Sequence, residues 1–445
     1  MNDARKGRLN RAWQRLAPWP DALRERLFAS LSQRAYYGWT ILAVASLGIF
    51  ASGPGQSHTF SVFVGPISRD LGLSSSAIAT AYGLATLVAA FCLPAMGRLV
   101  DRHGPRRMAI VVIALLGLAC ILFGAASGMV TLALGFAALR FFGQGSVMMN
   151  CANLVAQWFS RKRGFALSLM ALGFGASMAV HPPLGQYLVA QYGWRTAWVV
   201  LGLLTWLIML PPLLLLVYDK PEDRGLHPDG EGDEQASASA AAGSLNGLTL
   251  REALRTPAFY ILGAGWFAIA MLVTTLHFYQ VSILHTQGVA VEIAARVFPV
   301  SAAAMMIAMP FVGRAFDRMR TRHVFGAGLL ITSVSLIGIT FVHDLPGAIA
   351  YALLFGLNNA FSMTMFGYLM PRYFGRKHLG SLQGTGQMLA VVGASLGPLP
   401  VGLAFDYLGS ATLTLRVLAL LPFLCFIAAM FLRTPAGVPH AAHQE

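Results

Sequence analysis

Charged residues are scarce in this chain, and their scarcity excludes an ordinary soluble protein. Asp, Glu, Lys and Arg make up 11% of the 445 residues, whereas a soluble domain carries about 25%. Hydrophobic residues make up 56%, and the mean hydropathy is +0.63. Because such a chain cannot cover itself with polar surface, we predict an all-α integral membrane protein.

Acids and cysteines are scarcer still. The 18 Asp and Glu residues all lie in tails, between apolar stretches or at their ends, so no carboxylate is expected at mid-membrane. Neither an H-E-x-x-H motif nor a carboxylate pair is present, and we predict no enzyme. The four cysteines lie apart in apolar stretches, so we predict no metal site and no cofactor. Residues 1–35 lack a continuous apolar run, and no cleaved signal peptide is expected.

Long apolar stretches are what the chain has instead. Windows of about 20 nearly uncharged residues have the length of a bilayer-crossing helix. Twelve such stretches occur, at 38–65, 76–99, 108–127, 130–157, 164–191, 196–218, 258–286, 292–315, 323–342, 346–371, 379–406 and 411–432. We therefore predict twelve transmembrane helices.

The basic residues are concentrated in alternate loops. If the N-terminus is cytoplasmic, 27 of the 32 Lys and Arg residues fall in cytoplasmic segments, as the positive-inside rule requires. We predict a multi-pass protein of the cell (inner) membrane, with both termini in the cytoplasm. The pI near 10.1 then reflects this orientation, and we predict no nucleic-acid partner.

An internal repeat divides the chain. "GRLVDRHGPRR" at 97–107 recurs as "GRAFDRMRTR" at 313–322, 216 positions later. Thr249 and Glu252 have capping-box spacing, which predicts a short helix before the seventh span. We predict five segments: a cytoplasmic arm (1–35), a six-helix half (36–218), a cytoplasmic linker (219–256), a second six-helix half (257–433) and a cytoplasmic tail (434–445).

Two parallel six-helix halves are typical of secondary transporters, whose sites lie between the halves near the midplane. The G-x-L-x-D-R-x-G-x-R signature that begins at Gly97, with its repeat, resembles the major facilitator superfamily over residues 36–433. "GPRR", "RTPAFY" and "KPEDRGLHPDG" resemble its branch of monocarboxylate transporters and oxalate/formate antiporters. The resemblance implies the twelve-helix major facilitator fold and a small-molecule substrate, and we expect the chain to function as a monomer in the lipid bilayer.

In that family, the loop after the second span latches the halves in the outward-open state. The resemblance implies a gating role for Gly97, Asp101, Arg102 and Arg106, and for their repeats Gly313, Asp317, Arg318 and Arg322. The alternative is that the arginines only orient the protein. The two acids, repeated in register, favour a switchable contact.

Arg140 is the one arginine expected deep inside a span. At about 1.5 Å per residue it lies about 15 Å deep, where an arginine is costly unless it faces a partner or a wet cavity. Gln144 and Asn150 add polar capacity nearby. We interpret these three as candidates to bind a substrate anion, with a structural role for Arg140 as the alternative.

Three histidines fall near the level of Arg140, namely His58, His181 and His277. Because histidine titrates near neutral pH, they are candidates to carry a proton in place of the absent carboxylates, with packing as the alternative. His58 and His277 are also candidate substrate ligands. Candidate cavity amides of the second half are Asn358, Asn359, Gln383 and Gln387, whose alternative role is to join helices.

The chain departs from the branch at its carboxylate anchors. Met305 and Met309 stand where mammalian-type monocarboxylate transporters have an Asp and an Arg, and the oxalate exchanger's lysine in the eleventh span is missing. Our leading hypothesis is secondary active transport of a small organic solute, such as a monocarboxylate in symport with protons. The alternatives are efflux of amphipathic or drug-like compounds, and a membrane sensor without transport.

Overall fold

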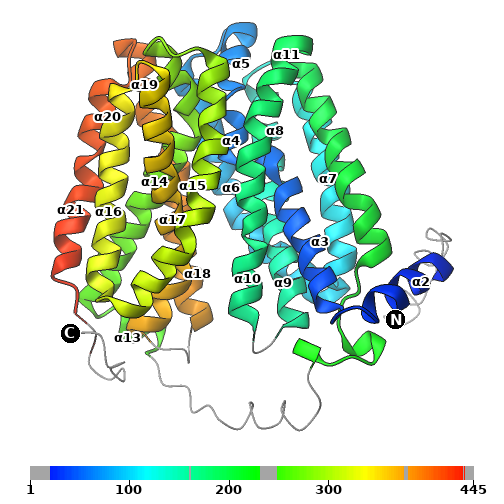
Figure 1. Ribbon diagram of the computed structural model, residues 1–445. Helices are drawn as coiled ribbons and strands as arrows, with labels where there is room; N and C mark the ends of the chain where they lie inside the picture. The colour runs from blue at the N-terminus through cyan, green and yellow to red at the C-terminus, as the bar shows by residue number, and fades with distance from the viewer. Residues whose placement is uncertain (1–20, 160–161, 231–247, 375–378, 434, 436–445) are drawn as a thin grey trace.

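The computed structural model describes residues 21–159, 162–230, 248–374, 379–433 and 435. Its regular elements are helices, arranged as two bundles side by side (Figure 1). The first described helix, α2 (Asp21–Ser32), and the end of the last helix lie at one end of the molecule, here called the basal end. The opposite end, where α5 (Val64–Leu71) lies, is called the distal end.

The first bundle holds the first six spans. In chain order its elements are α3 (Gly38–Ala51), η1 (Gly53–Gly55), α4 (Ser57–Phe60), α5, α6 (Ser75–His103), α7 (Pro105–Gly124), α8 (Met129–Leu139), η2 (Arg140–Val147), α9 (Met148–Trp158), α10 (Arg163–Met170) and α11 (Leu172–Leu216). The short basal elements that follow are η3 (Glu222–Arg224), η4 (Pro228–Gly230) and α13 (Leu250–Ala253). The capping box predicted for Thr249 and Glu252 begins α13 and is confirmed.

The second bundle holds the last six spans. Its elements are α14 (Pro257–Thr286), α15 (Val291–Arg318), α16 (Thr321–Gly338), η5 (Ile339–Phe341), α17 (Leu345–Phe374), α18 (Leu379–Leu396), α19 (Pro398–Leu408), α20 (Thr412–Leu418) and α21 (Leu420–Met430).

The predicted twelve spans are confirmed. In the described residues, ten helical stretches are long and apolar enough to cross a membrane. One of them, Phe165–Leu216, contains two spans, because Gly193 breaks it with a φ of 77°. The first span is added by α3, η1 and α4, which a proline at Pro54 divides into short pieces.

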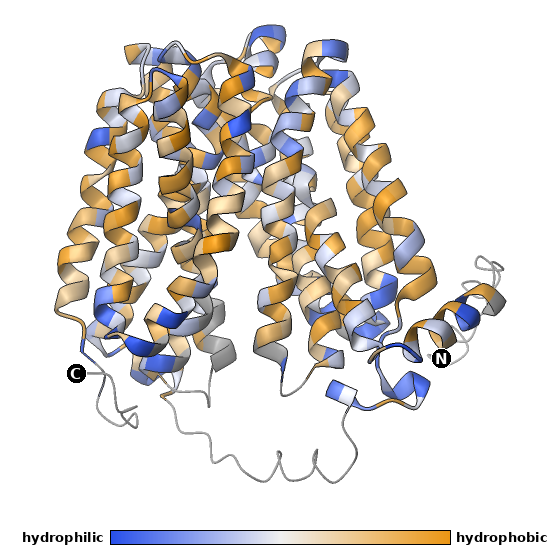
Figure 2. Ribbon diagram, in the orientation of Figure 1, coloured by the Kyte–Doolittle hydropathy of each residue, from blue (hydrophilic) through white to orange (hydrophobic). Residues whose placement is uncertain are grey.

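The outer surface of the two bundles is largely apolar, as expected of a surface in contact with lipid. Figure 2 shows hydrophobic residues along the outward faces of the helices and hydrophilic residues at the two ends. Large apolar side chains such as Leu207, Leu134 and Phe431 are exposed. Because apolar area of this extent is unfavourable in water, the fold is that of a multi-pass membrane protein.

Small residues set the close packing inside each bundle. The sixth span packs against the third, where a Cβ on Gly202 would lie 2.6 Å from the carbonyl oxygen of Gly117. Helices in lipid associate through such small residues, because lipid tails are as apolar as the side chains and give no hydrophobic driving force.

The two halves meet at the distal end. The carboxylate of Asp406, in α19, accepts hydrogen bonds from the backbone nitrogens of Ser75 at 2.9 Å and Ser76 at 2.8 Å. Asp406 therefore caps the N-terminus of α6 across the boundary between the halves, a position that favours negative charge. Beside it, the Tyr279 hydroxyl donates to the Ser75 carbonyl oxygen at 2.7 Å. We call this group the distal contact.

The basal ends of the halves diverge. Figure 1 shows a gap between the basal end of α10 in the first half and the basal ends of α17 and α18 in the second half. Phe165 at the start of α10 and Met388 in α18 are exposed. The described arrangement is thus joined distally and spread basally.

Candidate functional site

Two irregular helical segments meet inside the first half. The first span contains the 3₁₀ turn η1, and the fourth span contains the π-helical segment η2. They touch closely, because a Cβ on Gly55 would lie 2.7 Å from the Cα atom of Gly143. Irregular backbone at membrane depth occurs where it is buried in protein or lines a cavity, and π-helical turns are frequent at functional sites.

Arg140, at the start of η2, is buried at 3% exposure and held by neutral partners. Its Nη1 atom donates to the Gly55 carbonyl oxygen at 3.0 Å and approaches Ser57 Oγ at 3.4 Å. Its Nε atom donates to Thr86 Oγ1 at 3.2 Å, and its guanidinium lies 5.0 Å from the centre of the Tyr82 ring. In the described residues no carboxylate pairs with it, so the site keeps a positive charge.

A serine links two of the predicted histidines. Ser177 Oγ lies 3.1 Å from His58 Nε2 and 3.2 Å from His181 Nδ1. His58 follows directly on Ser57, which contacts Arg140. The structure therefore brings Arg140, His58 and His181 into one connected polar group in the first half.

His277 joins this group from the second half. The His58 and His277 rings contact each other with centroids 6.0 Å apart, and we call them the histidine pair. Phe174, Phe298 and Phe355 surround them, with Phe355 4.9 Å from the His277 ring. Among the described residues, His58 Nδ1 and His277 Nε2 are buried and have no hydrogen-bond partner. Unpaired polar atoms of this kind are rare in buried positions and call for an explanation.

Three predicted amides, Asn150, Asn358 and Asn359, remain partly unsatisfied. Asn359 Nδ2 donates to the Phe355 carbonyl oxygen at 2.8 Å, and Asn150 Nδ2 donates to that of Ser146 at 2.7 Å. The Oδ1 atoms of Asn150 and Asn359 are buried without a partner in the described chain. Residues four apart share a helix face, so Asn359 lies on the same face of α17 as Phe355, which contacts His277.

Asn358 and the predicted glutamines lie differently. Asn358 Oδ1 accepts from Thr332 at 2.8 Å and so joins the tenth span to the ninth, while its Nδ2 is buried without a partner in the described chain. Gln144 is half-buried and Gln387 is exposed. The side chain of Gln383 lies outside the described residues.

Sequence reasoning missed two serines. Ser177 lies four residues before His181, a spacing that could have indicated their contact. Ser301 in α15 is fully buried with an unpartnered Oγ, and it shares a helix face with Phe298 beside the histidine pair. No sequence signal distinguishes Ser301 from other serines in apolar helices. His, Cys, Asp and Glu side chains of the described residues form no group that could hold a metal.

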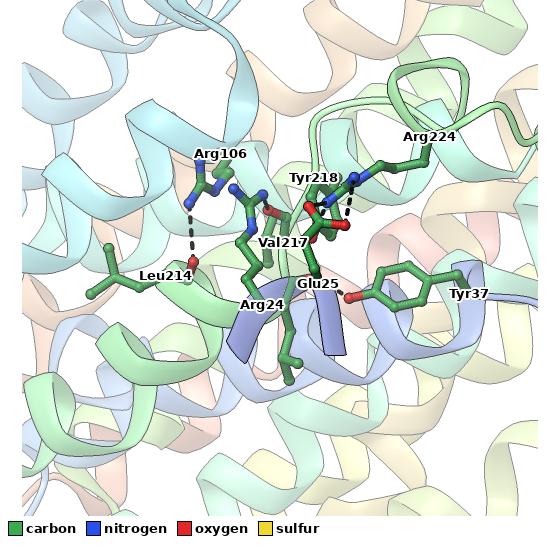
Figure 3. Close-up of polar contacts among 9 residues, drawn as sticks. Arg24, Glu25, Tyr37, Arg106, Leu214, Val217, Tyr218 and Arg224 are labelled. Carbon is green, nitrogen blue, oxygen red and sulfur yellow. Dashed lines mark hydrogen bonds and ion pairs between the residues drawn. The ribbon is translucent and has the colours of Figure 1, made fainter. Parts of the chain in front are cut away.

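The basal motif contacts its own half. The backbone nitrogen of Arg106 donates to Asp219 Oδ1 at 2.8 Å. The Nη2 atom of Arg106 donates to the Leu214 carbonyl oxygen at 3.0 Å (Figure 3). These bonds tie the start of α7 to the end of α11. The predicted gating acids, Asp101 and Asp317, have side chains outside the described residues.

The motif glycines are not closely packed in this arrangement. A Cβ on Gly97 would meet only Met149 Sδ, at 3.9 Å, and one on Gly313 would meet no atom within 4 Å among those described. Arg102 and Arg318 are exposed and Arg322 is half-buried. This open environment agrees with the basal separation of the halves.

Helix α2 is docked on the basal surface of the first half. Arg24 donates to the Val217 carbonyl oxygen at 2.7 Å, and Glu25 pairs with Arg224 (Figure 3). Hydrogen bonds from Arg224 lower the pKa of the Glu25 carboxyl. The arm and the first part of the linker therefore belong structurally to the first half.

Comparisons with known proteins agree with this architecture. The chain is 26% identical over 405 residues to an uncharacterized 38 kDa protein in the 23S RNA operon of Thermoproteus tenax, covering 89% of this chain and 95% of that one. It is 26% identical over 238 residues to the oxalate:formate antiporter of Oxalobacter formigenes, covering 52% of each chain. It is 28% identical over 169 residues to human monocarboxylate transporter 11, covering 38% of this chain and 36% of that one.

A solved structure has the same fold. It is the inward-facing, unoccupied form of a bacterial homologue of the human lysosomal transporter Spinster, with a TM-score of 0.65 and 16% identity, covering 89% of this chain and 95% of that one. The family model of the Major Facilitator Superfamily matches residues 38–319 and 286–445. The chain therefore belongs to the Major Facilitator Superfamily.

Proposed function

We propose that this protein is a secondary active transporter of a small organic anion, with a monocarboxylate as the first candidate and protons as the coupling ion. The observation that carries the proposal is Arg140, a buried arginine whose described partners are all neutral. The names of the relatives, an oxalate:formate antiporter and a monocarboxylate transporter, support an organic acid as substrate.

The charge of Arg140 explains why an anion is favoured. A charged group in the membrane interior costs several kcal/mol unless it is compensated. The Gly55 carbonyl oxygen and the hydroxyls of Ser57 and Thr86 supply dipoles but no opposite charge. A bound carboxylate would supply that charge through charge-assisted hydrogen bonds, which are about twice as strong as neutral ones.

The arrangement of the halves supports alternating access. The distal contact closes one end, while the basal ends of α10 and α18 lie apart. We assign the basal end to the cytoplasm, because the basic loops lie there and positive charge favours the cytoplasmic side. On this assignment the distal contact closes the side away from the cytoplasm. Closing the basal end and opening the distal contact would expose Arg140 to the other side of the cell inner membrane.

Efflux of amphipathic compounds is the alternative function. Met305 and Met306 of α15 lie against Gly175 of α11 at the boundary between the halves, with Met305 Cε 3.1 Å from the position of a Cβ on Gly175. Methionine side chains adapt to ligands of different shape. An adaptable apolar surface next to the site favours this second candidate.

Uptake into liposomes separates these functions. Purified protein would be reconstituted and offered labelled monocarboxylates, dicarboxylates, neutral metabolites and an amphipathic cation, with protein-free liposomes as the control. The proposal predicts protein-dependent uptake of carboxylates that exceeds uptake of neutral compounds at least tenfold. Uptake of the amphipathic cation in place of carboxylates would overturn the proposal and favour efflux.

A further inference from the structure

We propose that His58 and His277 share one coupling proton across the boundary between the halves, and that this proton and the bound anion stabilise each other. The proposal rests on the proposed function and names the residues that would hold the coupling proton. Of the three proton-coupling candidates predicted from sequence, His58 and His277 share the proton, and His181 is linked to His58 through Ser177. His58 belongs to α4 of the first half and His277 to α14 of the second.

The unsatisfied atoms of the pair carry the argument. A neutral imidazole has one nitrogen that donates and one that accepts. His58 uses Nε2 for its contact with Ser177, and its Nδ1 is buried without a partner in the described chain. His277 Nε2 is equally buried and unpartnered, and the two rings are in contact. One added proton would let one ring donate to the other, so that both orphaned nitrogens are satisfied by a bond between the halves.

Ser177 fits the role of a positioning residue for this proton. When the proton is added to His58 Nδ1, the Nε2–H group donates to Ser177 Oγ. His181 Nδ1 lies 3.2 Å from the same Oγ and 3.1 Å from the Ser177 carbonyl oxygen, so its N–H group donates to Ser177. Adding the coupling proton forms one N–H bond at His58 and breaks no other covalent bond.

The charged and titratable groups that face the pair are few. Arg140 approaches from the fourth span through Ser57, and His181 from the fifth span through Ser177. The Tyr82 phenol lies 2.6 Å from Ser57 Oγ.

From the tenth span, the Tyr351 phenol stacks on Phe355 behind His277. In the described residues, no carboxylate touches either ring of the pair. Among the described residues of this group, the permanent charge is therefore the positive charge of Arg140.

This charge balance couples the proton to the anion. A proton on the pair adds a second positive charge near Arg140, which is unfavourable where the dielectric constant is low. A bound anion removes that repulsion, so the anion raises the affinity for the proton. By linkage, the proton raises the affinity for the anion by the same factor. The protein can then switch between its two open states with both ligands bound or with neither. No carboxylate of the protein is needed to carry the proton.

Calorimetric titration of the wild-type protein with the transported anion tests this coupling. Measured in two buffers of different ionisation heat, binding is expected to take up about one proton per anion and, by linkage, to weaken about a hundredfold when the pH rises by two units. In His58→Gln and His277→Gln, proton uptake should fall below a tenth of the wild-type value and the remaining weak affinity should no longer depend on pH. Because one proton is shared, the double variant should be no weaker than either single variant.

The outcomes separate the two proposals. His343→Gln, an exposed histidine at the distal end, is the matched control and should keep the proton uptake. Anion binding without proton uptake in the wild type would overturn the shared proton and leave the anion transporter standing. Absence of anion binding at every pH would overturn both.

Discussion

At the scale of single residues, the sequence indicated which side chain matters but not what holds it. Arg140 stood out because it is an arginine in an apolar span. Its partners Gly55, Ser57 and Thr86 come from the first two spans, more than 50 positions away. Neither glycine nor hydroxyl residues carry a signal for such a contact, because both are common in membrane helices.

Gly55 should be intolerant of substitution. In Gly55→Ala the new methyl group would lie 2.7 Å from the Gly143 Cα atom and 3.0 Å from the Gln144 backbone nitrogen, neither of which can move alone. We expect destabilisation of about 1–3 kcal/mol, as for other overpacked sites, together with weaker anion binding as the Gly55 carbonyl shifts from Arg140. Thermal unfolding in detergent measures the first effect.

The matched control is Gly65→Ala in α5. A Cβ there would have no described neighbour within 4 Å, so its unfolding temperature should stay close to that of the wild type. Equal unfolding temperatures for Gly55→Ala and Gly65→Ala would show that the contact between η1 and η2 is not tight.

At the scale of elements, local signals were read correctly where a short motif suffices. The capping box at Thr249 begins a helix as predicted. The π-helical form of η2 was not predictable, because it depends on the packing of the fourth span against η1. The distal contact was not predictable either, because Asp406 and Ser75 are 331 positions apart.

Asp406 should control the distal contact. Asp406→Asn removes the negative charge at the N-terminus of α6 and leaves an amide that can accept more weakly. We expect the population of the distal-open state to rise about tenfold, which corresponds to about 1.4 kcal/mol.

Distances between spin labels measure this shift. Labels would be placed through Tyr192→Cys and Tyr407→Cys, both exposed at the distal end on opposite halves, after replacement of the four native cysteines. Asp344→Asn is the control, because Asp344 caps Gly347 within its own helix. Unchanged distances in Asp406→Asn would count against its role as a latch.

At the scale of the whole molecule, composition and the repeat predicted the fold well. Twelve spans in two halves follow from hydrophobic length and from the recurrence of one loop motif. The conformational state could not be predicted, since one sequence must be compatible with both open states. The pairing of His58 with His277 is likewise a property of the state, because it joins side chains from different halves.

The assigned orientation predicts which residues are reached from outside the cell. In a cysteine-free background, Tyr407→Cys at the distal end should react with a membrane-impermeant maleimide in intact cells. Met319→Cys, exposed in the basal loop after α15, should react only after permeabilisation. The opposite pattern would reverse the assignment of the basal end to the cytoplasm.

The central claim is that Arg140 binds the transported anion, and exchange of labelled anion across reconstituted liposomes tests it most directly. Arg140→Lys keeps the charge but loses the forked geometry, and Arg140→Gln loses both. The account predicts initial rates about tenfold lower or more in both variants, with the greater loss in Arg140→Gln. Arg69→Ala, an exposed distal arginine, should exchange at the wild-type rate. Wild-type exchange by correctly folded Arg140→Gln would contradict the account.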